Sequence, residues 1–220
     1  ETDLNLIGKL ASQLSWAQLL EVSFSKKGLV KGDRIYELME LLTKGKTFHE
    51  TNIPFAAVAT DIESGDEVII QEGLVVDAIM ASISIPGIFV PVRRGDKLLV
   101  DGAVVNGLPV GPLRDMGADI IIAILVEPSK GHSHVQNIFD VILQSVDIMQ
   151  AELMASKTID ADIIIRPEVG HYTANQLDKA ESIIRAGREA TSALLPDIKK
   201  RLSSHNELED LDRAKSSVYN

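Results

Sequence analysis

The 220-residue chain contains no cysteine. This excludes disulfides, thiolate metal sites and a cysteine nucleophile, and it suits a reducing compartment. Basic residues are also scarce, since 22 lysines and arginines stand against 32 aspartates and glutamates and leave a net charge of −10. A nucleic-acid binder needs a basic surface, so nucleic acid is not an expected partner. Long apolar runs are missing too, because segments 53–59 and 120–126 are far shorter than the ~20 residues that cross a bilayer.

What is present is an ordinary globular composition, with 45% hydrophobic and 25% charged residues. Apolar residues at helical spacing and short apolar runs between turn residues predict the secondary structure. The expected helices span 4–14, 33–44, 74–84, 138–155 and 175–195. The expected strands span 54–60, 67–70, 90–93, 97–100, 119–126 and 162–166.

Apolar strands that alternate with helices indicate an α/β fold with a mixed, mainly parallel sheet flanked by helices. Two antiparallel hairpins are expected inside it, one around Ser64-Gly65 and one around Arg94-Gly95-Asp96. We expect one domain over residues 1–202, with Pro196 close to a helix break. The polar segment 203–220 is expected to be a flexible tail.

Asp101 is the strongest candidate for a catalytic residue. It follows the apolar strand 97–100 and precedes Gly102, which allows close approach of another backbone or a ligand. A carboxylate held at a strand end suits a general base, because the sheet fixes its position. An alternative interpretation is that Asp101 only caps the following turn through an Asx-type hydrogen bond.

Other polar residues have weaker claims. Asp61 fits ordinary hairpin chemistry, and Ser82 and Ser84 fit close helix packing, since their surroundings are not Gly-x-Ser-x-Gly. The His132/His134 pair lacks an evident third ligand, so no metal is expected. His49, His171 and the Arg94-Gly95-Asp96 tripeptide are expected in surface or turn positions. The chain has no phosphate-binding glycine motif, so no nucleotide cofactor is expected.

A series of motifs in a fixed order resembles the bacterial patatin-like phospholipase family. The ordered match covers roughly Gly28 to Val126 and continues more loosely through the helix 140–155 to the strand that ends at Arg166-Pro167. The motifs are Ala59-Thr60-Asp61-Ile62-Glu63-Ser64-Gly65, the run from Ala78 to Pro91, the run Leu99-Val100-Asp101-Gly102-Ala103-Val104-Val105-Asn106, Leu108-Pro109-Val110 and Gly117-Ala118-Asp119.

The resemblance implies a three-layer α/β fold and a lipid acyl hydrolase that uses a Ser-Asp dyad without a cofactor. Asp101 would then be the catalytic base, with Gly102 and Ala103 as the supporting residues of its motif. An ionised aspartate can take a proton from a serine hydroxyl, and the acyl-enzyme formed is then hydrolysed by water.

The sequence departs from the family in one respect. It contains neither Gly-x-Ser-x-Gly nor a glycine-rich oxyanion loop. By analogy with the family, we expect the N-terminal strands that carry these motifs to be missing and this chain alone to be inactive. The alternative is a non-catalytic fragment or scaffold of the same fold. Exposed sheet edges would favour a homo-oligomer.

The resemblance also implies a lipid or another acyl ester as substrate and a cytoplasmic protein that is able to associate with membranes. Leu29, Val30, Ile88 and Phe89 are candidates for an acyl-binding mouth with peripheral membrane contact. Core packing explains these four side chains equally well.

Overall fold

The computed structural model describes residues 4–14, 32–126, 138–156, 160–172 and 176–218. The helices are α1 (Leu4–Gln13), α3 (Asp33–Thr43), α4 (Val75–Ser82), α5 (Ala103–Asn106), α6 (Val110–Asp115), α7 (Ile138–Ser156) and α8 (Ala180–Val218), with short 3₁₀ turns η1 (Phe48–Glu50) and η2 (Leu177–Lys179). The strands are β1 (Ala57–Asp61), β2 (Glu67–Ile70), β3 (Val92–Arg94), β4 (Lys97–Asp101), β5 (Ile122–Ile124) and β6 (Ile163–Ile165).

The α/β class is confirmed, but the strand pairing differs from the expected mainly parallel arrangement. One sheet has the order β2-β1-β4-β3, and each of its pairs is antiparallel. β5 and β6 form a separate parallel pair. The reason is that both hairpins lie in one sheet and pair with each other through β1 and β4. Antiparallel pairing therefore prevails in the described residues.

Both predicted hairpins are confirmed. Gly65 (φ 81°) lies in the turn between β1 and β2, and Gly95 (φ 63°) lies in the turn between β3 and β4. These positive φ values favour glycine, which has no Cβ to clash with the backbone. Arg94-Gly95-Asp96 is thus a hairpin turn, as expected.

The first core lies between this sheet and α4. It combines alternate residues of the strands with small residues on one helix face, which allow the helix to pack closely on the sheet. Its buried members are Phe48, Ala57, Ala59, Ile70, Val75, Ala78, Ala81 and Leu99.

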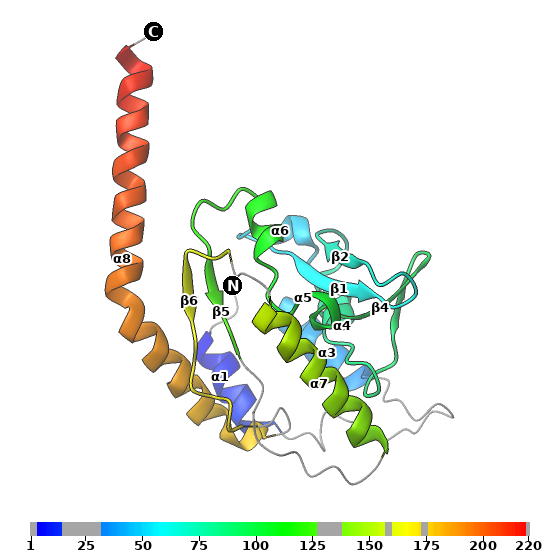
Figure 1. The fold of residues 1–220 in the computed structure, drawn as a ribbon. Helices are drawn as coiled ribbons and strands as arrows, with labels where there is room; N and C mark the ends of the chain where they lie inside the picture. Colours follow the sequence, from blue (N-terminus) through cyan, green and yellow to red (C-terminus); the bar gives the residue numbers. More distant parts are fainter. Residues whose placement is uncertain (1–3, 15–31, 127–137, 157–159, 173–175, 219–220) are drawn as a thin grey trace.

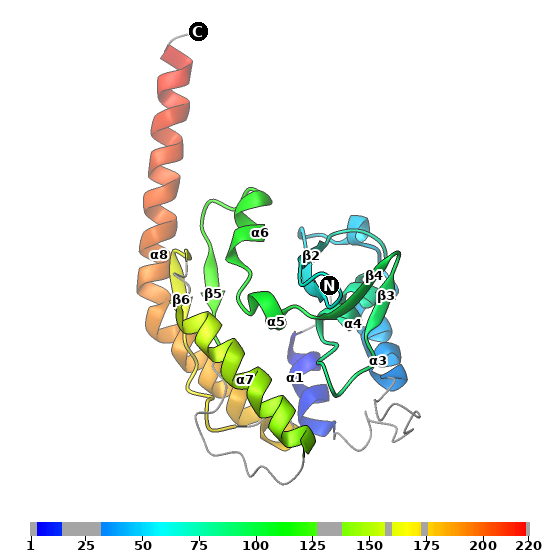
Figure 2. The same cartoon turned by 45° about the vertical axis from the view of Figure 1, so that its right-hand side comes forward.

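A second, smaller core lies under β5. It consists of Val110 from α6 together with Ile121 and Ala123. In Figure 2 the antiparallel sheet with α3 and α4 lies on one side of the molecule, β5, β6, α7 and α8 lie on the other, and α5 and α6 lie between them. The chain leaves β4 at Asp101 and enters α5 directly, so Asp101 lies at the junction of the two sides.

The last helix, α8, is longer than expected, since it includes the polar segment 203–218. Its C-terminal end extends away from the rest of the molecule (Figure 1). Pro196 lies within the helix instead of ending it. A proline removes one helical hydrogen bond and favours a bend. The flexibility of the polar segment stays a prediction.

Candidate active site

The backbone of Asp101 is held from two directions. Asp101 is the last residue of β4, where it is paired with Ala59 of β1. Its N–H donates a hydrogen bond to the Ser84 carbonyl (3.0 Å), and its carbonyl accepts one from the Thr60 hydroxyl (3.0 Å). Thr60 and Ser84 are both buried. These contacts fix where the Asp101 side chain leaves the sheet.

The carboxylate of Asp101 is only partly engaged. One oxygen accepts a hydrogen bond from the Ala103 N–H (2.8 Å), which is the Asx-type contact considered in the sequence analysis. The structure gives the other oxygen no hydrogen-bond or ion-pair partner within the described residues. Burial raises the pKa of Asp101, and the hydrogen bond from Ala103 opposes that rise. The capping role and an available oxygen therefore coexist.

Gly102 is required by the packing of this junction. A Cβ atom at this position would lie 2.3 Å from the Val58 carbonyl oxygen and 2.7 Å from its carbon. Backbone atoms cannot yield to that contact without moving β1. The Gly102 φ is −64°, so the constraint is space and not conformation.

Ala103 is the first residue of α5 and lines a cavity of about 230 Å³. The other walls come from the segment that follows α5, from the start of α6 and from one face of α7. The lining residues are Ala103, Val105, Asn106, Gly107, Leu108, Val110, Gly111, Gln150, Leu153, Met154 and Asp160. Asp101 is not among them, but it lies two residues from the wall.

Asp61 has a different environment. Burial opposes its ionisation, but hydrogen bonds from the N–H groups of Glu63 and Leu98 and from the Ser64 hydroxyl, together with the Lys97 ammonium at 3.8 Å, lower the pKa of Asp61. These contacts close the first hairpin, and they agree with the expected turn role.

The two serines near the end of α4 do not resemble activated nucleophiles. Ser84 is buried, and its hydroxyl donates to the Met80 carbonyl at 2.6 Å. Ser82 is the last residue of α4 and is half-buried. Ser84 still contributes to the site through its carbonyl, a role that sequence patterns did not indicate.

The structure does not test the histidine pair as a metal site. His132 and His134 lie outside the described residues. His49 and His171 are exposed, as expected. The part of the chain that the structure describes contains no cluster of three or more metal-ligating side chains.

The candidate acyl-binding mouth is described only in part, because Leu29 and Val30 lie outside the described residues. Ile88 is half-buried, while Phe89 is buried and faces Gly32. Core packing accounts for Phe89. No helix in the described ranges is long and apolar enough to cross a membrane.

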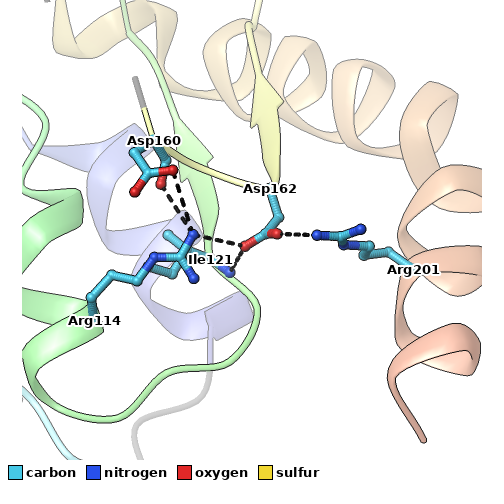
Figure 3. Close-up of polar contacts among 5 residues, drawn as sticks. All are labelled: Arg114, Ile121, Asp160, Asp162 and Arg201. Atoms are coloured by element: carbon cyan, nitrogen blue, oxygen red, sulfur yellow. Dashed lines mark hydrogen bonds and ion pairs between the residues drawn. The ribbon is translucent and has the colours of Figure 1, made fainter. Parts of the chain in front are cut away.

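A second aspartate, Asp162, is the centre of a charged cluster that sequence analysis missed (Figure 3). Its carboxylate accepts the Ile121 N–H (2.9 Å), pairs with Arg201 of α8 (2.5 Å) and lies 3.5 Å from Arg114 of α6. The Ile121 N–H, the hydrogen bond from Arg201 and the positive charge of both arginines lower the pKa of Asp162. The cluster joins β5, β6, α6 and α8 and serves the fold.

Comparison with known families identifies the chain. A family model described as patatin-like phospholipase matches residues 3–114, which is half of the sequence and includes Asp101, Gly102 and Ala103. The chain belongs to the patatin-like phospholipase family.

Several proteins resemble the chain over part of its length. One uncharacterized NTE family protein of Mycobacterium tuberculosis is 33% identical over 122 residues, which cover 56% of this chain and 34% of that protein. A second from the same organism is 27% identical over 198 residues, which cover 77% of this chain and 34% of that protein. Patatin-like phospholipase domain-containing protein 7 of Rattus norvegicus is 26% identical over 108 residues, covering 48% of this chain and 8% of that protein.

The chain therefore spans about a third of the length of the mycobacterial relatives that it matches. The motifs that the sequence analysis took from the family lie largely within the region of the family match. The family prediction is confirmed on this ground.

Proposed function

We propose that the whole protein is a serine esterase or phospholipase that hydrolyses lipid acyl esters, with Asp101 as the base of a Ser-Asp dyad. The observation that carries the proposal is the state of the Asp101 carboxylate. Its backbone is held by Thr60 and Ser84, one oxygen is anchored by Ala103, and the second oxygen has no partner within the described residues. Such an oxygen is available to accept a proton.

The burial of Asp101 supports this role. A carboxylate whose pKa is raised by burial is a stronger base than an exposed one. In the proposed reaction the serine oxygen attacks the ester carbonyl while its proton passes to the Asp101 oxygen. The proton then goes to the departing alcohol, and water hydrolyses the acyl-enzyme with Asp101 again as base.

The serine and the oxyanion donors are not recognisable in the 220 residues, which contain no Gly-x-Ser-x-Gly. We propose that they are supplied by parts of the whole protein outside these residues. Residues 1–220 alone are then expected to be inactive toward esters. Covalent labelling of this chain by a fluorophosphonate probe would contradict that expectation.

The test compares ester hydrolysis by the whole protein and by its Asp101→Asn variant on a short p-nitrophenyl ester. Loss of a general base is expected to reduce kcat by about 100-fold or more. Asp96→Asn is the matched control, because Asp96 is an exposed aspartate in the turn of the same hairpin. Turnover of Asp101→Asn within about threefold of the unmodified protein would remove Asp101 as the base.

A second candidate function, a non-catalytic scaffold of the same fold, is favoured by one observation. Apolar side chains are exposed on β5, just after it and on α7, including Ile124 (58% exposed), Val126 (62%) and Met149 (58%). Exposed apolar surface of this kind suits a contact with another protein. If the chain acts in this way, gel filtration of residues 1–220 will show an oligomer, and a stable monomer would count against it.

A further inference from the structure

A second cavity, of about 300 Å³, lies away from Asp101 and is not used by the proposed reaction. It is formed where the end of α3, the turn around η1, the approach to β1 and the start of α4 meet. Its lining residues are Leu42, Thr43, Lys44, Lys46, Thr51, Asn52, Ile53, Phe55 and Val75. Its volume is at the lower end of the range of small-molecule sites, about 300 to 1,000 Å³.

One side of this cavity is apolar and open to solvent. Ile53 is 72% exposed, and Phe55 is 41% exposed while its ring stacks on Phe48 at 5.6 Å. Leu41, the neighbour of the lining residue Leu42, is 74% exposed. Large apolar side chains gathered at a cavity mouth gain free energy when an apolar ligand covers them.

The lining of the cavity also includes two positively charged residues, Lys44 and Lys46. The ammonium of Lys44 has no hydrogen-bond or ion-pair partner in the described part of the chain. Lys46 donates one hydrogen bond, to the Glu50 carbonyl (3.2 Å), and retains further N–H donors. The Glu50 carboxylate is engaged by the N–H and hydroxyl of Thr47.

The position of Lys44 is fixed by the backbone. Lys44 has φ 57°, and its N–H donates to the carbonyl of Leu41 in the last turn of α3. A lysine at a helix C-terminus also favours the helix dipole, but this effect explains neither the cavity nor the exposed Ile53 and Phe55. The combination of apolar side chains with two lysine ammonium groups matches one chemical class.

We propose that this cavity binds a single-chain anionic amphiphile, such as a fatty acid, with its alkyl chain against Ile53 and Phe55 and its anionic head group at Lys44 and Lys46. The two lysines favour an anionic head group by charge complementarity. This local positive charge is needed because the chain as a whole carries a net charge of −10, which repels anions. The site does not depend on the proposed dyad. Its occupant is a ligand in its own right, held apart from the carboxylate that is proposed to react.

The experiment is a calorimetric titration of residues 1–220 with octanoate, decanoate, decyl phosphate and decanol, each below its aggregation concentration. We expect one saturable site per chain for the anions, with affinity rising by about fourfold per added methylene. Decanol is expected to bind at least fivefold more weakly than decanoate. The comparison of decanoate with decyl phosphate tells whether a carboxylate or a phosphate head group is preferred, and either preference supports the proposal.

Two pairs of exposed-site variants make the test specific. Lys44→Gln is expected to weaken decanoate binding by about five- to tenfold, whereas Lys179→Gln, which removes another exposed lysine, leaves it unchanged. Ile53→Asp is expected to abolish binding, whereas Ile62→Asp, at an exposed isoleucine in the first hairpin, does not. Thermal melting of each variant checks that it is folded.

The proposal is overturned if no saturable decanoate binding is seen, if decanol binds as tightly as decanoate, or if Lys44→Gln and Lys179→Gln behave alike. Asp101→Asn must leave decanoate binding unchanged. Failure of the dyad would therefore appear only in ester turnover, and failure of this site only in the titration.

Discussion

Asp101 is the last residue of β4 and Asp162 immediately precedes β6, yet their surroundings shift their pKa values in opposite directions. Asp101 accepts one described hydrogen bond, from the next turn, and burial raises its pKa. Asp162 accepts hydrogen bonds from the Ile121 N–H and from Arg201 and forms an ion pair with Arg114, and these contacts lower its pKa.

The comparison separates two uses of the same side chain. A carboxylate whose oxygens are all engaged by donors stabilises the fold and is a poor base, because protonation would break its contacts. A carboxylate with one oxygen anchored and one oxygen free can accept a proton at little cost in contacts. The number of donors around each aspartate, more than its place on a strand, distinguishes the candidate site from the structural cluster.

The largest effect is expected from Gly102→Ala, which tests how tightly the backbone next to Asp101 packs against β1. The new Cβ would meet the Val58 carbonyl at 2.3 Å, so β1 and β4 have to separate. We expect the free energy of unfolding to fall by about 3 kcal/mol. Urea unfolding measures it.

Gly111→Ala is the matched control for that change. Gly111 lies in α6, and its added Cβ would have no atom within 4 Å. Alanine is expected to raise the free energy of unfolding there by about 0.5 to 1 kcal/mol. If Gly102→Ala were as well tolerated, the close approach of the strand end to β1 would be wrong.

The next largest effect is expected from Asp162→Asn. At pH 7 this change removes the charge that holds Arg114 and Arg201, and we expect a loss of about 1 to 2 kcal/mol, reduced by the partial exposure of both arginines. A lowered pKa in the folded state stabilises the fold above the ordinary aspartate value of about 3.9, and that stabilisation is lost as pH falls through the folded-state pKa.

The measurement is the free energy of unfolding of both proteins from pH 7 to pH 2. The difference between them is expected to shrink only below about pH 4. A difference that stays constant to pH 2 would mean that the carboxylate charge contributes nothing.

A smaller effect is expected from Thr60→Val, which removes the hydroxyl that donates to the Asp101 carbonyl while keeping the shape of the side chain. Loss of this buried hydrogen bond is expected to cost about 1 kcal/mol in urea unfolding. Thr43→Val is the control, because the Thr43 hydroxyl donates only to carbonyls of the preceding turn of α3, those of Met39 and Glu40. Equal losses in the two variants would show that Thr60 has no special part in holding the strand end.

The sequence predicted Asp101 and both hairpins because these features are local. A carboxylate between an apolar strand and a glycine, or a Ser-Gly and Arg-Gly-Asp turn between strands, is visible within ten residues. The antiparallel pairing of β1 with β4 was not predicted, because it joins residues about 40 positions apart and strand patterns do not reveal direction.

The contacts around the two aspartates show the same limit. Thr60 is a polar residue inside an apolar strand, and this was a signal that could have marked it as a hydrogen-bonding position. Arg201 lies 39 residues from Asp162 on an otherwise ordinary charged helix, so no pattern predicted that contact. Family resemblance supplied the role proposed for Asp101, whereas the available carboxylate oxygen became evident only from the fold.

The smallest expected effect sharpens the comparison most, because it has the opposite sign to that of Asp162→Asn. A pKa raised by burial means that folding favours the protonated form of Asp101, so its contribution to stability is fully present below pH 3.9 or so and is lost as pH rises through the folded-state pKa. Asparagine resembles the protonated form and can still accept the Ala103 N–H. Asp101→Asn is therefore expected to be slightly more stable than the unmodified chain at pH 7 and equally stable at pH 3, by urea unfolding at both pH values. The opposite result would be a variant that is destabilised relative to the unmodified chain at pH 7 but not at pH 3. Asp101 would then be a structural carboxylate like Asp162, and the proposed dyad would lack its base.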